Sequence, residues 1–540
     1  MDSTIRTQVL VVGAGPVGMT AAILLASHGV QVTVVEKNAR TADDPKAISL
    51  DDESLRVYQR AGLADEVLRV IVPGTGTTYY GADGAEIFHG GATIPFRFGF
   101  PFKNPFAQPD LERVLRRALD AHPLIDVRFS TELVALEESP DCITASVTDA
   151  EGPFAVAADF VLGADGGRSR VRADLGISMT GRSHEDVWLV IDTTGDDHHE
   201  RYGMHHGDPR RPHVIVPGLN GRCRYEFYLY PDEVSSWVAP PFDLMERLLA
   251  PYRAIREHEV ERAVAYRFHG LIADEWRRGR ALLLGDAAHM MPPFAGQGLN
   301  SGIRDAANLT WKIASVLRGD ASPDLLDTYQ LERRPHAAAV VRSSERLGRV
   351  VMTTNTRLAE FRDRVVRDAM ATEEGRAYFE GMKYRPSTRL QGGVVVDPES
   401  HPLVGWALGQ PRVFDFAAHR VVPLDELTGT DWAVIGVGID DDRGHATWTS
   451  AISALGHLDP AYVDVPVDDL VHERPPEVRV AIDVDTRLYA EVDSARGCFI
   501  VQRPDRVVAG VAVADVDALT LLSIRLRDIV GGRQAVSSAV

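Results

Sequence analysis

Three short segments carry residue types that could bind a dinucleotide or a related cofactor. The first, Gly13-Ala14-Gly15-Pro16-Val17-Gly18, fits G-x-G-x-x-G between a short β-branched run and an alanine- and leucine-rich run. Gly13 permits the tight turn, Gly15 lets a pyrophosphate approach the backbone, and Gly18 lets the helix pack on the strand. Glu36 ends the next apolar run, where a carboxylate would bind the ribose hydroxyls of adenosine. Helix packing alone would explain the glycines, but strand, helix and Glu36 together favour dinucleotide binding.

A second segment, residues 279 to 319, brings a carboxylate and a glycine-rich loop to the start of a helix. Its apolar run ends at Gly285-Asp286, and an amphipathic pattern begins near Asn300 or Ser301. An isolated Gly-Asp could merely cap the next segment. Here Asp286 could accept from ribityl hydroxyls, and the free amides of the helix start could stabilise negative charge on a reduced flavin ring. The segment therefore predicts FAD, approached closely by Gly296, Gly298, Leu299 and Asn300.

A third segment, "FVLGADGGRSRVRADLG", also ends a strand on a carboxylate. Asp165 follows the apolar run, and a helix carrying Arg168, Arg170 and Arg172 comes next. Taken alone, this pattern could be a turn before a solvated basic helix. Together with the other two segments it indicates a further part of the cofactor site.

The elements that must position these segments alternate between strands and helices. We expect a helix over 51–70 capped by Asp51 or Asp52, a hairpin turning at Asp83-Gly84, and a helix over 109–122. Residues 181–270 are predicted mostly as strands. We expect an FAD-binding domain in two parts, residues 1–180 and 271–345, with a hairpin near 75–100 that belongs to the substrate domain. The β-sheet substrate domain would span 181–270. A helical connector (346–393) and a C-terminal α/β domain (394–540) would follow.

Composition narrows the possible partners and the compartment. The formal net charge is −19, from 77 acidic and 58 basic residues, so nucleic acid and anionic membranes are not expected as partners. Three scattered cysteines indicate a reducing compartment and argue against a disulfide framework or a thiolate metal cluster. We find neither a signal peptide nor an apolar run of the roughly 20 residues a membrane span needs. The expectation is a soluble, cytoplasmic protein.

These segments together resemble the class A, single-component flavoprotein aromatic hydroxylases. All three occur in that family's order over roughly residues 5 to 345. Further pieces, such as "AISLDDESLRVYQRAGL", "FAQPDLE" and "HPLVGWALGQPRV", resemble its 3-(3-hydroxyphenyl)propionate hydroxylase subgroup. The resemblance implies an α/β fold with a Rossmann-like FAD-binding domain of the p-hydroxybenzoate hydroxylase type, a mainly β substrate domain and a C-terminal thioredoxin-like domain. That last domain lacks Cys-x-x-Cys, so a structural or dimer-stabilising role is expected of it.

The resemblance also implies roles for individual residues. Gln108 would lie near the flavin ribityl chain or ring, and Asp165 would serve both FAD and the nicotinamide cofactor. Lys46 stands where the family usually has an arginine that contacts cofactor phosphates or adenosine. Pro292 and Pro293 would shape the loop beside the flavin, where a proline carbonyl can orient a substrate hydroxyl. His289 is expected to be a structural hydrogen-bond partner, with an acid–base role as the alternative.

The chemistry implied by the resemblance is ortho-hydroxylation of a phenol. NADH or NADPH would reduce FAD, O2 would form a flavin C4a-hydroperoxide shielded from water, and the phenol would become a catechol. A phenolic acid needs a cation for its carboxylate and a hydroxyl partner. The candidates are Arg211, Arg224, His213 and Tyr225, although strand alternation puts Arg224 and Tyr225 on opposite faces. Each could instead stabilise the fold.

Three other functions share parts of this sequence pattern. A polyketide or antibiotic tailoring hydroxylase would act on a larger aromatic substrate with much the same scaffold. A flavin-dependent halogenase is disfavoured because W-x-W-x-I-P is absent. A non-catalytic binder on the same scaffold is disfavoured by the intact Gly-Asp segment. We expect a homodimer or a monomer.

Overall fold

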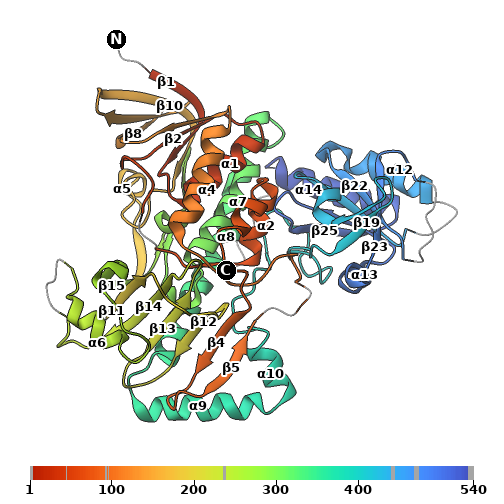
Figure 1. Ribbon diagram of the computed structural model, residues 1–540. Helices are drawn as coiled ribbons and strands as arrows, with labels where there is room; N and C mark the ends of the chain where they lie inside the picture. Colours follow the sequence, from red (N-terminus) through yellow and green to blue (C-terminus); the bar gives the residue numbers. More distant parts are fainter. Residues whose placement is uncertain are drawn as a thin grey trace. The chain divides into compact units, whose positions relative to one another are not determined.

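The computed structural model of the chain describes residues 4–43, 46–91, 94, 96–234, 239–439, 444–467 and 474–532 (Figure 1). It divides into two compact units. Unit 1 comprises residues 1–96, 100–306 and 337–386, and unit 2 comprises 97–99, 307–336 and 387–540. The expected boundary at 394 therefore falls inside unit 2, which also includes parts of two helices assigned from sequence to the FAD-binding domain. Residues 533–540 of the expected last domain lie outside the described residues.

The first sheet of unit 1 is mainly parallel, with the order β16-β17-β10-β1-β2-β7 and with β9 and β8 continuing antiparallel from β10. Its central strands are apolar and buried on both faces, as in Val9 to Val12, because helices cover a parallel sheet. Helices α1 (Pro16–Ser27) and α4 (Gln108–Ala121) pack side by side on it (Figure 1). The strands are β1 (Thr4–Val12), β2 (Val32–Val35), β7 (Ile125–Arg128), β8 (Glu132–Glu138), β9 (Ile143–Asp149), β10 (Gly152–Gly163), β16 (Arg277–Arg278) and β17 (Ala281–Leu283).

The parallel register brings the three sequence segments to one edge of this sheet. Val12 at the end of β1 is level with Val35 of β2 and Gly163 of β10, and Gly163 is level with Leu283 of β17. The glycine turn, Glu36, Asp165 and the Gly-Asp pair each follow one of these strand ends. Ligands bind at this edge in open α/β sheets, so the sequence segments converge on one site.

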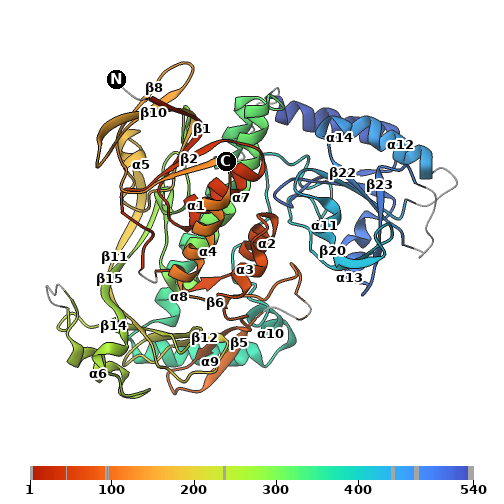
Figure 2. The same ribbon diagram turned by 45° about the horizontal axis from the view of Figure 1, so that its top comes forward.

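The second sheet of unit 1 has the order β18-β15-β11-β14-β13-β12-β4-β5. The expected hairpin at Asp83-Gly84 is confirmed, since it joins β4 to β5. Figure 2 shows the long strands β11 and β15 leading from the first sheet towards the second. The strands are β4 (Gly76–Tyr80), β5 (Glu86–Gly90), β11 (Met179–Thr193), β12 (Tyr202–His206), β13 (His213–Pro217), β14 (Cys223–Leu229), β15 (Val260–Ala273) and β18 (His289–Met290).

Two helix boundaries in unit 1 differ from those expected from the sequence. Asp51 caps α2 (Asp52–Arg60) by accepting from Ser54 N at 2.9 Å, but α2 ends before Gly62, whose φ of +73° breaks the single helix expected over 51–70. Helix α7 begins at Gly298, before Asn300. The other elements are α3 (Ala64–Leu68), α5 (Arg170–Asp174), α6 (Phe242–Leu249), α9 (Thr356–Met370), α10 (Glu373–Phe379), β3 (Ser49–Leu50) and β6 (Asn104–Pro105). Helix α7 (Gly298–Arg318) begins in unit 1 and ends in unit 2, and α8 (Asp327–Val351) begins in unit 2 and ends in unit 1.

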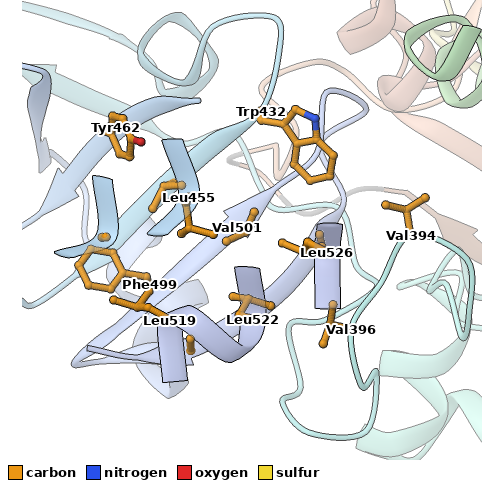
Figure 3. Close-up of a cluster of buried hydrophobic side chains, with 14 of the residues drawn as sticks. Val394, Val396, Trp432, Leu455, Tyr462, Phe499, Val501, Leu519, Leu522 and Leu526 are labelled. Atoms are coloured by element: carbon orange, nitrogen blue, oxygen red, sulfur yellow. The ribbon is translucent and has the colours of Figure 1, made fainter. Parts of the chain in front are cut away.

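Unit 2 is built on one mixed sheet with the order β20-β19-β23-β22-β21-β24-β25. Successive residues of β21 point to opposite faces: Val434 joins a core with α12 and α14, and Ile435 joins one with α11 and α13. Figure 3 shows the first core, with Phe499, Leu519 and Leu522 among its labelled side chains. The elements are β19 (Arg412–Asp415), β20 (Arg420–Pro423), α11 (Leu424–Thr428), β21 (Ala433–Val437), α12 (Gly444–Leu455), β22 (Ala461–Val465), β23 (Val478–Asp483), α13 (Arg487–Val492), β24 (Cys498–Gln502), β25 (Val508–Val513) and α14 (Val516–Val530).

A sheet covered by helices on both faces, with three parallel strands (β21, β22, β23) followed by antiparallel β24 and β25, matches the expected thioredoxin-like arrangement. Cys498 is free. Among the described residues, no helix combines the length and the apolar character that crossing a bilayer requires.

A buried charge cluster ties separate parts of unit 2 together. The carboxylate of Glu332 accepts from Asn308 Nδ2 at 2.7 Å, Lys312 Nζ at 2.8 Å and Val394 N at 2.7 Å. It also accepts from Arg503 Nη1 at 3.0 Å and Nη2 at 2.7 Å, and none of the three charged side chains is exposed. Burial alone would raise the pKa of Glu332, but Arg503 and Lys312 hold it at about 2.

We predict that Glu332→Gln destabilises unit 2 by about 3–5 kcal/mol, because it removes the carboxylate that Lys312 and Arg503 share and leaves Arg503, among the described residues, with only the carboxylate of Asp505, at 2.6 Å. Urea unfolding followed by the fluorescence of the buried Trp311, Trp432 and Trp448 would measure this. The exposed Glu477→Gln is the matched control. Since the folded pKa lies below the ordinary 4.5, the contribution of Glu332 is present above pH 4.5 and falls as the pH drops towards 2. Equal unfolding midpoints for the two variants would contradict the prediction.

Candidate functional site

A cavity of about 830 Å³ lies within unit 1. It begins at the carboxyl edge of the first sheet and ends against one face of the second sheet. Its volume lies in the upper part of the range of about 300–1,000 Å³ typical of small-molecule and cofactor pockets. Every cofactor segment identified in the sequence contributes lining residues.

The glycine turn forms one end of the cavity. Gly13 has a φ of +106°, and a Cβ there would run into the Ala164 carbonyl. A Cβ on Gly18 would clash with the Gly13 carbonyl, whereas a Cβ on Gly15 would meet nothing within 4 Å. Thus Gly13 and Gly18 must be glycines for the turn and helix to pack. The backbone of Gly15 borders open space in the cavity, where a pyrophosphate would approach. Pro16 begins α1, a position where the missing N–H costs nothing.

Glu36 lies beside this turn. Its carboxylate accepts from Ala14 N at 2.9 Å and from Asn38 N at 2.9 Å, and it lines the cavity. These two bonds hold the carboxylate at the end of β2. Lys46 also lines the cavity, through a loop whose backbone is bonded to the second sheet.

Asp165 has one oxygen in use and one without a partner. Oδ2 accepts from Arg170 N at 2.6 Å and Val171 N at 3.1 Å, at the start of α5. Oδ1 is buried and has no hydrogen-bond partner among the described residues. Because a buried acceptor rarely stays unsatisfied, this oxygen suits a donor on a ligand. Arg172 donates to Ala287 O at 2.9 Å and so joins this segment to the Gly-Asp segment.

Of the pair Gly285-Asp286, Asp286 lines the cavity and Gly285 does not. Burial raises the pKa of its carboxyl group, so a donor that satisfies the carboxylate would favour the ionised form. Gly285 N donates to Asp305 Oδ2 at 3.2 Å, and His289 Nε2 donates to the same oxygen at 2.7 Å. His289 is fully buried outside the cavity lining. Its position supports a structural role, with Asp305 as its partner.

The loop before α7 has two kinds of residue. Pro293, Gly296, Gly298 and Leu299 line the cavity, whereas Pro292 and Asn300 do not. Asn300 is fully buried and acts as a clamp. Its Oδ1 accepts from Asp51 N at 3.0 Å, and its Nδ2 donates to Ser49 O at 3.0 Å and to Gly296 O at 2.8 Å. The expectation of a direct cofactor contact from Asn300 is thus replaced by a positioning role.

Gln108 lines the middle of the cavity. Its Oε1 accepts from Ala47 N at 2.8 Å, and its Nε2 donates to Glu112 Oε1 at 2.7 Å. Burial raises the pKa of Glu112 to about 7. Glu112 was not selected from the sequence, although it lies one helical turn after Gln108 and therefore on the same face.

The second sheet presents a face of paired charges to the cavity. Arg224 is 5% exposed and donates to both oxygens of Asp192, at 2.6 and 3.0 Å, and to Lys46 O at 2.7 Å. Arg262 lies 3.7 Å from Asp192. Burial raises the pKa of Tyr266 to about 12. Arg262 and Tyr266 were missed in the sequence, yet they share one face of β15 by simple alternation.

Two expected substrate residues lie elsewhere. Arg211 pairs with Glu233 at 2.6 Å and donates to Tyr228 O at 2.8 Å. Tyr225 lies in the apolar core on the opposite face of β14 from Arg224 and donates to Asp196 Oδ2 at 2.8 Å. Neither lines the cavity, and His213 does not either. Arg211 and Tyr225 thus have partners within the protein, away from the cavity, and a strand sequence alone does not reveal which face of the strand meets a cavity.

Comparisons with known proteins agree with a flavin site. A family model described as FAD binding domain matches residues 6–344, and one described as HcaD C-terminal domain matches residues 405–522. A Mycolicibacterium smegmatis protein named 3-(3-hydroxy-phenyl)propionate/3-hydroxycinnamic acid hydroxylase is 36% identical over 523 residues, covering 95% of this chain and 92% of the relative. A Burkholderia vietnamiensis protein of the same name, numbered 2, is 35% identical and covers 97% and 96%.

Among solved structures, the flavin-dependent monooxygenase PieE in complex with FAD and substrate gives a TM-score of 0.78 at 22% identity, covering 97% of this chain and 99% of that one. This likeness concerns the fold. With the family match it confirms the α/β fold with an FAD-binding domain of the p-hydroxybenzoate hydroxylase type. The prediction of FAD is confirmed as well.

We predict that Asp286→Ala weakens FAD binding by about 10- to 100-fold, since a hydrogen bond to a charged group contributes ~1.5–3 kcal/mol. Asp286→Asn keeps an acceptor and should lose less. The exposed Asp141→Ala is the control. Visible absorbance per mole of purified protein measures the bound flavin. Full flavin occupancy in Asp286→Ala would contradict the assignment of this carboxylate to the cofactor.

Proposed function

We propose, since this chain belongs to the family of FAD-dependent aromatic hydroxylases, that it ortho-hydroxylates a 3-hydroxyphenyl acid to the corresponding catechol. The protein is an enzyme, and its substrate would be 3-(3-hydroxyphenyl)propionate or a close relative. The observation that carries this proposal is the match to hydroxylases of that name over nearly the whole chain, the C-terminal part included. NADH or NADPH and O2 would be the co-substrates.

The residues of the cavity fit FAD. Bound FAD would supply electron transfer from the nicotinamide cofactor and the activation of O2. The turn at Gly13 to Gly18 and Glu36 would hold the adenosine diphosphate part, with Lys46 near its phosphates. Asp286 would accept from the ribityl hydroxyls, near Gln108. The backbone of Gly296 to Leu299, at the start of α7, would meet the ring.

The chain itself would orient the phenol and exclude water. The part of the cavity against the second sheet is walled by Val190, Val214, Val264 and Phe268, which provide an apolar floor for an aromatic ring. Pro293 would offer its carbonyl to the substrate hydroxyl. Exclusion of water matters because the activated oxygen would otherwise be lost as hydrogen peroxide.

Two broader proposals follow from sequence features. We place the reaction in the cytoplasm because the three cysteines are unpaired, as expected in a reducing compartment. We propose a monomer or a homodimer, with unit 2 in a structural role since Cys498 has no second cysteine with which to cycle.

The test is oxidation of NADH, with NADPH in parallel, by the holoenzyme with and without 3-(3-hydroxyphenyl)propionate, counting hydrogen peroxide against catechol. Strong stimulation with little peroxide is expected. Stimulation with mostly peroxide would mean that the acid binds without being hydroxylated. Stimulation only by larger polycyclic phenols would favour a tailoring hydroxylase instead.

A further inference from the structure

One buried cation in the cavity lacks a carboxylate partner. The side chain of Lys103 lines the cavity and the residue is 7% exposed. Its Nζ donates to Thr77 Oγ1 of β4 at 2.9 Å. In the part of the chain that the structure describes, this hydroxyl is its only hydrogen-bond partner and no carboxylate forms an ion pair with it. Burying an ammonium group in this way is unfavourable unless a ligand completes the site.

The backbone around Lys103 is fixed in an unusual conformation. Lys103 has a φ of +58°, which is unfavourable for a residue with a Cβ. The next residue holds it there: Asn104 Oδ1 accepts from Gly74 N at 2.8 Å, and Nδ2 donates to Leu50 O at 3.0 Å and to Pro101 O at 2.8 Å. A side chain on Gly74 would collide with the Lys103 carbonyl. Strained residues that their surroundings hold so firmly cluster at functional sites.

The charges that face Lys103 are positive or neutral. His205 of β12 lies near it, but burial holds the pKa of that imidazole well below its usual range, so it is neutral. Arg385 lies over the ring of Phe102 and 3.8 Å from Asp51. Burial, followed by the charge of Arg385, lowers the pKa of Lys103 to about 7. This end of the cavity therefore suits an anion.

The other basic residues on the second-sheet side have carboxylate partners. Arg224 and Arg262 share Asp192, at 2.6 and 3.7 Å. The remaining basic lining residues come from the cofactor segments and their neighbours: Lys37, Arg40, Lys46, Arg168 and Arg170. Lys103 is thus the cation best placed to meet an anion on the substrate.

Lys103 also lies where a substrate must lie. Its Cε is 3.9 Å from the position that a Cβ on Gly296 would take. Gly296 opens the loop that we assigned to the flavin ring. The ammonium group is therefore at the ring end of the cavity, beside the apolar floor of the second sheet, and not at the adenosine end.

We propose that Lys103 binds the carboxylate of the substrate as an ammonium ion and so selects 3-hydroxyphenyl acids over neutral phenols. This inference rests on the proposed function, and it assigns to Lys103 the role that was expected of Arg211. When the acid binds above pH 7, the neutral amine takes a proton from solvent, forming an N–H bond, and the resulting ammonium pairs with the carboxylate. No oxidation or reduction is involved.

Linkage gives the direction of the pH dependence. The charged form of Lys103 binds the acid, and in the free enzyme it prevails below a pKa of about 7. The carboxylate raises that pKa in the complex. Affinity for the acid is therefore fully present below pH 7 and falls above it, by up to about tenfold per pH unit. The neutral amide of the same acid should bind with no such dependence.

The experiment titrates the holoenzyme with 3-(3-hydroxyphenyl)propionate and with its amide, following flavin absorbance at several pH values. We expect Lys103→Met to weaken binding of the acid by about 10- to 100-fold and that of the amide by less than about threefold. Lys103→Arg keeps the charge at every pH, so acid binding should lose its pH dependence. The exposed Lys383→Met is the matched control. Calorimetry in two buffers should show proton uptake by the wild type at pH 8 that both Lys103 variants lack.

The outcomes separate two failures. If the wild type binds neither ligand, the proposed substrate class is wrong. If the wild type prefers the acid and Lys103→Met keeps that preference, the inference alone is overturned. Equal weakening of acid and amide would also overturn it, since that result would point to contact with the phenol part. Unchanged flavin content in Lys103→Met confirms that the variant is folded.

Discussion

The start of helix α7 is the constraint on which the site depends. Residues Gly296 to Leu299, which lead into this helix, must leave their backbone open to the cavity. An exposed glycine-rich loop does not by itself hold one conformation. The next turn supplies that reason, because Asn300 and Asp305 are fully buried and bond to several loops at once. Buried polar groups are unfavourable unless every partner is in place, so the loops are held in one arrangement.

The two ends of the cavity differ in how their buried polar and charged groups are compensated. At the first sheet, backbone amides and strand-end carboxylates dominate, which suits a pyrophosphate and ribose hydroxyls. At the second sheet, charges on adjacent strands neutralise one another, as Arg224 and Asp192 do over 2.6 Å. The ammonium group of Lys103 differs from these neutralised charges, because among the described residues its partner is the hydroxyl group of Thr77 and not a carboxylate. An enzyme that must bind an acid near a reactive ring needs such an imbalance, since a fully neutralised wall would not distinguish acids from neutral phenols.

Much of the first sheet could be predicted because its signals are local. The glycine turn lies between a strand and a helix within a few residues, and Asp51 caps the helix that directly follows it. The break at Gly62 was missed because the apolar pattern continues across it, and a positive φ leaves no trace in periodicity. Arg211 differs in kind: its residue type suits the carboxylate of a ligand, but its guanidinium pairs with Glu233, which is 22 residues further along the chain.

By itself the sequence determined the order of the elements, the cofactor segments and the opposite faces of Arg224 and Tyr225, since each depends on spacing along one strand or turn. Only the tertiary structure decided which face of the second sheet meets the cavity, and which charges find partners there. Lys103 illustrates the reason. Its pairing depends on Thr77, His205 and Arg385, which come from three distant parts of the chain. No local pattern encodes the distances between such residues; packing sets them.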